Sequence, residues 1–182
     1  MKDITRIIVV LTLTCVVCAL FLALVSSVTA ERIKDNATKN NNDAITALAP
    51  LAQRVEKTVV DSQTLYKLFD RQENLIGYAF LAQGQGYAGT IKIVAVLDSG
   101  LSTLEGIKVV ESVETPGLGG RIVESFFDSQ FKGLPVLPAI IALKDNPSKK
   151  NEIKTITGAT ISSRAVVSIL NKRIETIRKA LQ

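Results

Sequence analysis

The chain has 182 residues, 47% of them hydrophobic, and its 22 Lys and Arg residues outnumber its 17 Asp and Glu residues by five. Histidine is absent, and the two cysteines, Cys15 and Cys18, both lie near the N-terminus. These features exclude a Ser-His-Asp or Cys-His nucleophile system, His-ligated haem or zinc and, beyond the N-terminal segment, disulfides and cysteine-bound iron–sulfur clusters. Electron transfer would therefore need an organic cofactor, and we predict no metal site and no catalytic residue.

An almost unbroken apolar run from Ile7 to Val28 predicts a membrane-spanning helix. At 1.5 Å per residue, about 22 residues reach roughly 33 Å, which exceeds the roughly 30 Å hydrocarbon core of a bilayer. A signal peptide is the alternative, because Val28-Thr29-Ala30 is an acceptable cleavage site, but the run is longer than the apolar core of such peptides. We therefore expect an uncleaved anchor over residues 1–30, in contact with membrane lipid.

Cys15 and Cys18 form a Cys-x-x-Cys motif, which in a soluble domain would suggest redox or metal chemistry. Inside an apolar run, we interpret both as small packing residues that are compatible with lipid.

The orientation of the anchor follows from its flanks. The basic residues that flank the run on its two sides are Lys2, Arg6, Arg32 and Lys34. Their count is balanced, and a long following domain crosses the membrane largely regardless of its own charge. We place the N-terminus inside the cell and residues 31–182 outside it, in the periplasm where the cell has an outer membrane.

Residues 31–62 are expected to form a helical connector. Ala44, Leu48, Leu51, Ala52 and Val55 recur at steps of three and four residues, which is typical of a helix. Pro50 should kink this helix or restart it. The remaining residues, 63–182, have the size of one ordinary domain.

Three β-rich runs predict an antiparallel meander within this domain. The expected strands are Ile76–Leu81, Thr90–Leu97 and Leu104–Val113, with turns at Gly84–Tyr87 and Asp98–Gly100. Because the connections are short, neighbouring strands should be antiparallel.

Helical and irregular segments follow the meander. A short helix is expected over Arg121–Phe127, and the segment through Pro135 and Pro138 should be irregular. A final helix should begin near Ser163, since the following residues form one apolar stripe: Val166, Ile169, Leu170, Ile174, Ile177 and Leu181. The predicted class is therefore α+β, an antiparallel sheet with flanking helices behind a single transmembrane helix.

The basic residues of this last helix do not indicate nucleic acid. They are Lys172, Arg173, Arg178 and Lys179. Aromatic residues are few and an extracytoplasmic domain meets no DNA. Contact with anionic lipid headgroups is one alternative, and we interpret the cluster as a solvated helix face.

The segment from Thr157 to Ser163 reads Thr-Gly-Ala-Thr-Ile-Ser-Ser, just before this helix. Gly158 permits a backbone conformation closed to other residues, and Ala159 allows a ligand to come close. The hydroxyls of Thr157, Thr160, Ser162 and Ser163 gather where a helix start would receive a phosphate. An ordinary Ser/Thr cap is the alternative, and we expect at least one of Thr157, Ser162 and Ser163 to serve only as a cap.

This segment resembles the flavinylation motif of the FMN-binding subunits of Rnf and Na+-pumping NADH:quinone oxidoreductase complexes. Two further segments agree in order and spacing: Glu114-Thr115-Pro116-Gly117-Leu118-Gly119 resembles the family's Glu-Thr-Pro-Gly-Leu-Gly loop, and Gly86–Ile91 resembles its Gly-Tyr-x-Gly-x-Ile stretch. The resemblance implies FMN joined by a phosphoester bond to Thr160. It also favours the uncleaved anchor.

The resemblance also indicates how the cofactor is held and attached. We expect Thr157, Ser162 and Ser163 to hydrogen-bond the phosphate, and the loop that contains Glu114, Thr115, Gly117, Leu118 and Gly119 to contact the flavin, with Leu118 against its ring. A plain turn is the alternative for that loop. With no histidine base in the chain, attachment is assigned to a separate flavin transferase that uses FAD and Mg2+. Many family members have an acidic residue where this chain has Lys154, which favours less efficient modification.

The implied function is an electron relay in an ion-translocating complex. The short length resembles the G subunit of the Rnf complex, whose partners would be the subunits A, B, C, D and E and whose reaction couples ferredoxin:NAD oxidoreduction to Na+ or H+ movement. Two alternatives remain: a tethered flavoprotein that serves a separate extracytoplasmic reductase, and a tethered interaction module without a cofactor.

Overall fold

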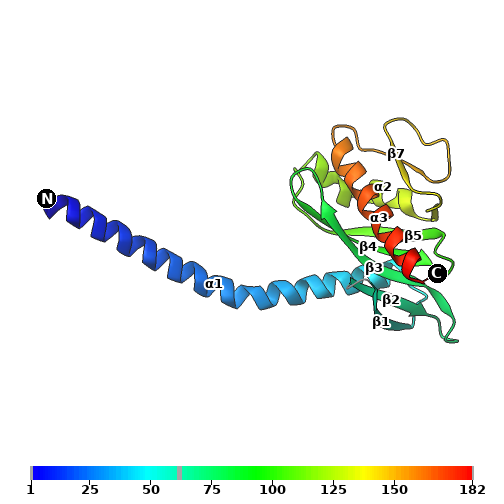
Figure 1. The fold of residues 1–182 in the computed structure, drawn as a ribbon, viewed down its shortest axis with the longest axis horizontal. Helices are drawn as coiled ribbons and strands as arrows, with labels where there is room; N and C mark the ends of the chain where they lie inside the picture. Colours follow the sequence, from blue (N-terminus) through cyan, green and yellow to red (C-terminus); the bar gives the residue numbers. More distant parts are fainter. Residues whose placement is uncertain (1, 61–62, 182) are drawn as a thin grey trace. The chain divides into compact units, whose positions relative to one another are not determined.

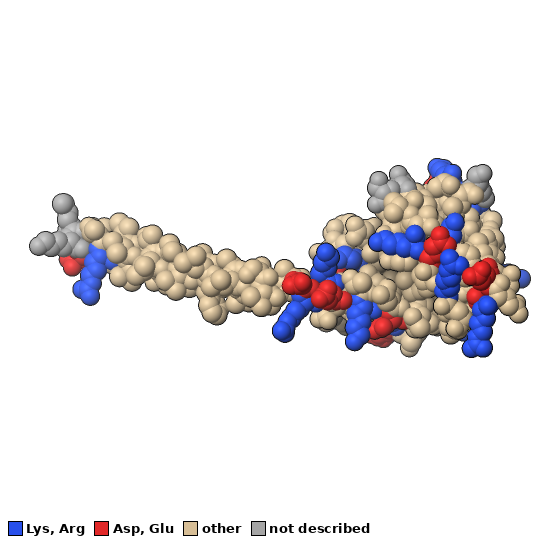
Figure 2. Space-filling model, turned by 90° about the horizontal axis from the view of Figure 1, so that it is seen from below, with Lys and Arg blue, Asp and Glu red and all other residues tan. Residues whose placement is uncertain are grey.

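The structure, a computed structural model, describes residues 2–60 and 63–181. The chain divides into two compact units, residues 1–40 and 41–182. The first unit is most of one helix, α1 (Lys2–Leu48), whose apolar side chains are exposed and whose thiols at Cys15 and Cys18 are free. Figure 2 shows its apolar stretch as a continuous uncharged surface. Among the described residues, α1 is the one helix long and apolar enough to cross a membrane.

The end of α1 corrects one expectation. The helix runs without a break through the polar residues after the apolar stretch and ends at Leu48, because Pro50 disfavours helical backbone in the residue before it. Leu51 and Ala52 lie outside the helix and Val55 lies in a strand, so a helix reaching Val55 was wrong. The division of the chain at residues 30 and 62 stays a prediction.

The second unit is built on an antiparallel sheet of six strands in sequence order (Figure 1). They are β1 (Arg54–Val60), β2 (Gln63–Phe69), β3 (Leu75–Gln85), β4 (Thr90–Asp98), β5 (Thr103–Ser112) and β6 (Leu134–Pro135). β7 (Ile141–Leu143) and β8 (Glu152–Lys154) form a small parallel pair. The helices are η1 (Gly119–Val123), α2 (Ser125–Asp128), η2 (Ser129–Phe131) and α3 (Thr160–Leu181). The predicted meander is confirmed as β3–β5, and the α+β class is confirmed.

The two faces of the sheet carry separate apolar cores, because successive side chains of a strand point to opposite sides. On β4, Ile93 and Leu97 belong to the larger core, which the buried face of α3 completes. Val94 and Val96 belong to the smaller core, together with Ala44 from the end of α1. The long C-terminal helix is therefore fixed along its length against one face of the sheet.

Four further details differ from the sequence-based expectations. The helix expected over Arg121–Phe127 consists of two short pieces, η1 and α2, separated at Glu124. The irregular segment contains β6, which pairs with β5. The last helix begins at Thr160 and not near Ser163. Arg173 is 5% exposed and donates a hydrogen bond to the carbonyl of Thr64, so the solvated-face interpretation was wrong for that residue.

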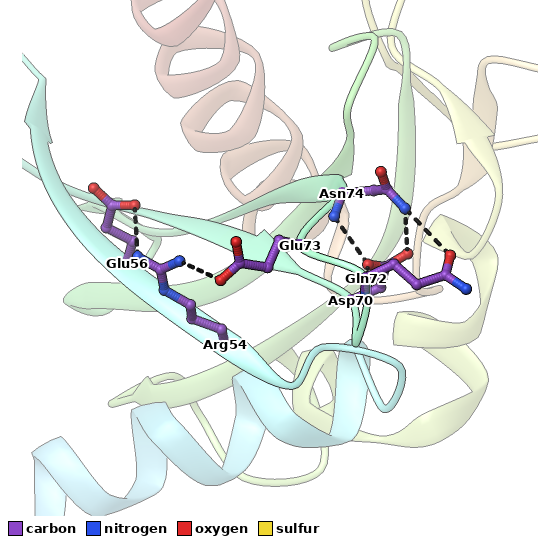
Figure 3. Close-up of polar contacts among 6 residues, drawn as sticks. All are labelled: Arg54, Glu56, Asp70, Gln72, Glu73 and Asn74. Atoms are coloured by element: carbon purple, nitrogen blue, oxygen red, sulfur yellow. Dashed lines mark hydrogen bonds and ion pairs between the residues drawn. The ribbon is translucent and has the colours of Figure 1, made fainter.

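The turn between β2 and β3 is held by polar contacts that Figure 3 draws. The Asp70 carboxylate accepts hydrogen bonds from the backbone N–H groups of Asn74, at 2.9 Å, and Gln72, at 2.8 Å. These bonds, with that from Asn74 first, lower the pKa of Asp70. Nearby, Arg54 pairs with Glu73 at 3.1 Å between exposed side chains. Exposed ion pairs contribute little stability. These contacts therefore set the shape of the turn more than they stabilise the fold.

Candidate functional site

The three segments identified in the sequence meet at one end of the sheet. β3 is antiparallel to β4, and β4 to β5, so the turn at residues 86–89 and the chain after Ser112 leave the sheet at the same end. The start of α3 reaches this end through a hydrogen bond between Ser162 and Glu114. Residues that are far apart in the sequence therefore form one site.

Glu114 joins the three segments. Its side chain is buried, with 6% of the residue exposed. Oε1 accepts a hydrogen bond from the Ala88 backbone N–H at 3.0 Å, and Oε2 accepts one from the Ser162 hydroxyl at 2.6 Å. One carboxylate thus connects the β3–β4 turn, the segment after β5 and the first turn of α3.

The same contacts keep this carboxylate ionised. Burial raises the pKa of Glu114, but hydrogen bonds donated by Ser162 and by the backbone N–H groups of Ala88, Tyr87 and Gly89 outweigh burial and hold the pKa below its ordinary value. The site therefore contains a buried negative charge at neutral pH, whose hydrogen bonds come from fixed donors.

Two glycines leave room for the Glu114 side chain. A Cβ on Gly119 would lie 2.5 Å from both Glu114 Oε2 and Ser162 Oγ. A Cβ on Gly86 would overlap Glu114 Oε1. Both loops are thus shaped around this carboxylate, and Gly119 also leaves room for Ser162 of the third segment.

The loop before α3 presents Thr160 at the helix start. Gly158 has a φ of +82°, in the left-handed region that favours glycine, while Ala159 is buried beneath the loop. Thr157 is exposed and Thr160, the first residue of α3, is half-buried. Within the described part of the chain, the backbone N–H groups of Thr160, Ile161 and Ser162 have no hydrogen-bond partner, as expected for the first turn of a helix. This arrangement can bind a phosphate.

The two serines of the motif are already engaged within the protein. Ser163 is fully buried; its hydroxyl donates to the Ala159 carbonyl and accepts from the Ile156 N–H, each at 3.0 Å. The Ser162 hydroxyl donates a hydrogen bond to the Glu114 carboxylate. Among the described residues, the motif hydroxyls that have no hydrogen-bond partner in the protein are therefore those of Thr157, which is exposed, and Thr160, which is half-buried.

The loop after Glu114 supplies an apolar surface beside Thr160. The Thr115 carbonyl accepts hydrogen bonds from the N–H groups of Leu118, at 3.2 Å, and Gly120, at 2.9 Å, and Gly117 has a φ of +76°. Leu118 is 50% exposed and lies beside Gly158. Three more exposed apolar side chains belong to the same segments: Tyr87, Val113 and Ile161. Free N–H groups next to exposed apolar side chains suit a ligand with a phosphate and a flat ring.

A separate hollow of about 710 Å³ lies on the opposite face of the sheet, next to the end of α1. Leu48, Leu68, Ile76 and Val96 line its apolar part. None of the site residues predicted from the sequence lines it.

Sequence reasoning placed Glu114 and Ser162 in the site but missed their contact. The two residues are 48 positions apart, and no local pattern marks a hydrogen bond across that separation. The glycines around Glu114 were the available signal, since a glycine in an ordered loop often marks a close approach.

Comparison with known proteins defines the class of this chain. Residues 86–175, which include all three segments, match the model of the FMN-binding domain. The chain is 32% identical to the G subunit of the ion-translocating oxidoreductase complex of Methanosarcina acetivorans, over 97% of this chain and 95% of that protein. It is 28% identical to the G subunit of the proton-translocating ferredoxin:NAD(+) oxidoreductase complex of Clostridium ljungdahlii, over 92% of this chain and 88% of that one. The chain belongs to the family of G subunits of Rnf-type ion-translocating oxidoreductase complexes.

Solved structures agree on the fold. The C subunit of the Na(+)-translocating NADH-quinone reductase of Parabacteroides distasonis is 24% identical, with a TM-score of 0.54 over 70% of this chain and 62% of that one. NqrC of Shewanella oneidensis is 18% identical, with a TM-score of 0.56 over 68% and 66% of the two chains.

Proposed function

We propose that this chain carries FMN covalently on Thr160 and relays electrons within a membrane-bound complex that couples ferredoxin:NAD oxidoreduction to Na+ or H+ movement. The observation that carries the proposal is the position of Thr160: it lies within the FMN-binding match, at the start of α3, where three backbone N–H groups, its own included, have no partner among residues 2–60 and 63–181. Similar subunits from Clostridium ljungdahlii and Acetobacterium woodii belong to proton-translocating and Na(+)-translocating ferredoxin:NAD(+) oxidoreductase complexes, which supports the reaction.

The chain's own residues would bind and orient the cofactor. The N–H groups of Thr160, Ile161 and Ser162 face the place of a phosphate on Thr160, where the positive end of the helix dipole also favours negative charge. Thr157 adds an exposed hydroxyl, and Leu118 offers an apolar surface to the ring. The flavin supplies the redox chemistry that no side chain of this domain provides.

Attachment needs a second protein. A threonine hydroxyl is a poor nucleophile at its own pKa, and the chain has no histidine to act as base. A flavin transferase would join the Thr160 oxygen to the FMN phosphorus of FAD, with release of AMP and of the hydroxyl proton, and Mg2+ would stabilise the transferring group. Lys154 is exposed, and its ammonium donates to Asn146 at 2.7 Å. Many members of the family have an acidic residue at this position, so we expect slower modification of this chain.

The partners follow from the same proposal. The domain of residues 41–182 would lie outside the cytoplasm, held by α1, and would exchange electrons with the other subunits of the complex, A to E. A covalent bond keeps the cofactor from being lost and fixes its distance to neighbouring redox centres.

The test is covalent modification of the full chain made in a host with a flavin transferase. Intact mass and in-gel ultraviolet fluorescence of the denatured protein should show one added FMN, and Thr160→Ala should remove it completely. Thr176→Ala is the matched control, because Thr176 lies on the same helix and its hydroxyl donates only to the Lys172 carbonyl. That variant should keep both the mass and the fluorescence.

The other results lead to different functions. An unmodified wild-type chain would overturn the covalent relay and favour a tethered interaction module. A modified chain that never co-purifies with other membrane subunits would favour a tethered flavoprotein that serves a separate reductase.

A further inference from the structure

We propose that Glu114 is a positioning residue for the flavin site: its carboxylate fixes the first turn of α3 against the two neighbouring loops. In this way it controls how fast FMN is transferred to Thr160 and how rigidly the bound ring is held. The proposal rests on the proposed function, because it assumes that Thr160 is the attachment point.

The contact with Ser162 fixes the rotation of the helix start. Successive helical residues are about 100° apart around the axis, so residues two apart are about 200° apart. Ser162 is buried and its hydroxyl is bonded to Glu114, which directs that side of the first turn inward. The side of Thr160 is then directed outward, as its partial exposure shows.

The second carboxylate oxygen fixes the loops around Thr160. Glu114 Oε1 holds the Ala88 N–H of the β3–β4 turn. From Glu114 the chain continues through the turn that carries Leu118, which lies beside Gly158 in the loop before α3. A shift of Glu114 would therefore move both Thr160 and the apolar surface next to it.

An ionised carboxylate suits this position, because the Ala88 N–H and the Ser162 hydroxyl both donate to it. A glutamine of the same shape would keep an oxygen for the Ala88 N–H, but its NH2 group would have to donate to the Ser162 hydroxyl, which also accepts. Glu114→Gln therefore preserves packing, reverses the bond to Ser162 and replaces charge-assisted hydrogen bonds by weaker neutral ones. Ser162→Ala breaks the α3 side alone.

The opposite end of the sheet provides a matched control. Asp98 Oδ1 accepts hydrogen bonds from the N–H groups of Ser102, at 2.7 Å, and Thr103, at 2.9 Å, while Oδ2 accepts one from the Ser102 hydroxyl at 2.8 Å. This is the same combination of carboxylate, serine and backbone donors. Strand β4 separates it from the site by about 25 Å, at roughly 3.3 Å per residue.

The experiment measures flavin transfer to the full chain in detergent, with a purified transferase, FAD and Mg2+. The variants are Glu114→Gln, Ser162→Ala, Asp98→Asn and Ser102→Ala. We expect kcat/KM for the acceptor chain to fall about tenfold or more in the first two, because small misplacements of a reacting group have large effects on rate. The two control variants should react at the wild-type rate, even where their melting temperatures fall as much as those of Glu114→Gln and Ser162→Ala.

A second measurement reports the bound state. After prolonged modification, the visible circular dichroism of the flavin should change in Glu114→Gln and Ser162→Ala but not in the controls. A wild-type rate and an unchanged spectrum in Ser162→Ala and Glu114→Gln would overturn the proposal. Equal losses in the Asp98 and Ser102 variants would also overturn it, since they would reflect stability alone. Failure of the wild-type chain to accept FMN at Thr160 would instead overturn the proposed function.

Discussion

Among the residues of the site, Glu114 combines burial with a negative charge, and its donors decide which effect dominates. Burial alone would favour the neutral form, yet the hydrogen bonds from Ser162 and the 87–89 turn hold the pKa below its ordinary value. Ionisation of this residue is therefore linked to folding. A carboxylate that only contacted ligand would not be linked in this way.

This linkage predicts how stability depends on pH. The folded-state pKa of Glu114 lies below its unfolded value of about 4.3, so the stabilisation is fully present above that pH and is lost as pH falls through the folded pKa. At pH 7, Glu114→Gln should lower the free energy of unfolding by about 1–3 kcal/mol. Between pH 6 and 3, the wild type should lose stability more steeply than the variant. Urea unfolding of the full chain, followed by circular dichroism at several pH values, measures the cost at pH 7 and the steepness of the loss at acid pH.

The control for this prediction is Glu152. Its pKa is also lowered, by the backbone N–H groups of Ser148 and Lys149. Glu152→Gln should also make the loss of stability between pH 6 and 3 less steep. The effects of Glu114→Gln and Glu152→Gln on the free energy of unfolding should add in the double variant, because the two residues lie in separate turns. An equal loss of stability between pH 6 and 3 in the wild type and in Glu114→Gln would contradict the linkage.

How much of the site could be predicted differs between residues. The Thr157–Ser163 segment was recognisable because glycine, alanine and hydroxyl residues at a helix start form a local pattern. The roles of its hydroxyls were not, since Ser162 and Ser163 are distinguished only by partners elsewhere in the fold, at Glu114 and Ile156. Whether each predicted contact touches flavin stays a prediction.

Among the elements, α3 connects the site to the core. Its start is held by the Ser163 hydroxyl, which accepts a hydrogen bond from the Ile156 N–H and donates one to the Ala159 carbonyl. Further along the helix, Leu170 and Ile177 are fully buried. The sequence located the apolar stripe of this helix but put its start too late, because Thr160 and Ile161 face away from the core.

Removal of the Ser163 hydroxyl should loosen this start. Ser163→Ala would leave the Ile156 N–H buried without an acceptor, at a cost of about 1–3 kcal/mol in the free energy of unfolding. Ser168→Ala, on the exposed side of the same helix, should change stability by about 0.5 kcal/mol or less. Chemical denaturation of the two variants compares them. Similar costs at both positions would show that the Ser163 bonds do not hold the helix start.

The sheet shows why some elements were predictable and others not. β4 is buried on both faces and rich in β-branched residues, so its pattern was clear. β1 is an edge strand with mostly exposed residues, among them Arg54, Glu56 and Lys57, and its valines also fit a helical spacing. Edge strands often carry charges, which hides them from pattern reasoning.

For the molecule as a whole, the chain consists of two units with different surfaces. The α1 stretch of the first unit exposes apolar side chains, whereas Figure 2 shows charges of both signs over the domain of residues 41–182. The first surface suits lipid and the second suits water. The long apolar helix was predictable because an apolar run of this length is a purely local feature, and its role as a membrane anchor stays a prediction.

The remaining question is on which side of the membrane the domain lies, and the two cysteines make it testable. Both lie in α1, so Cys15→Ala with Cys18→Ala gives a chain without thiols. Into it we would place Ser168→Cys, on the exposed side of α3, or Asp3→Cys, before the apolar run.

Charges flanking the run do not decide the orientation, but a long domain that follows a first anchor is translocated largely regardless of its own charge. In intact cells, or spheroplasts where there is an outer membrane, an impermeant maleimide should therefore label position 168 and leave position 3 unlabelled until the cells are lysed. Labelling of position 3 alone would put the domain in the cytoplasm and overturn the extracytoplasmic relay, because the cofactor on Thr160 would then lie on the other side of the membrane.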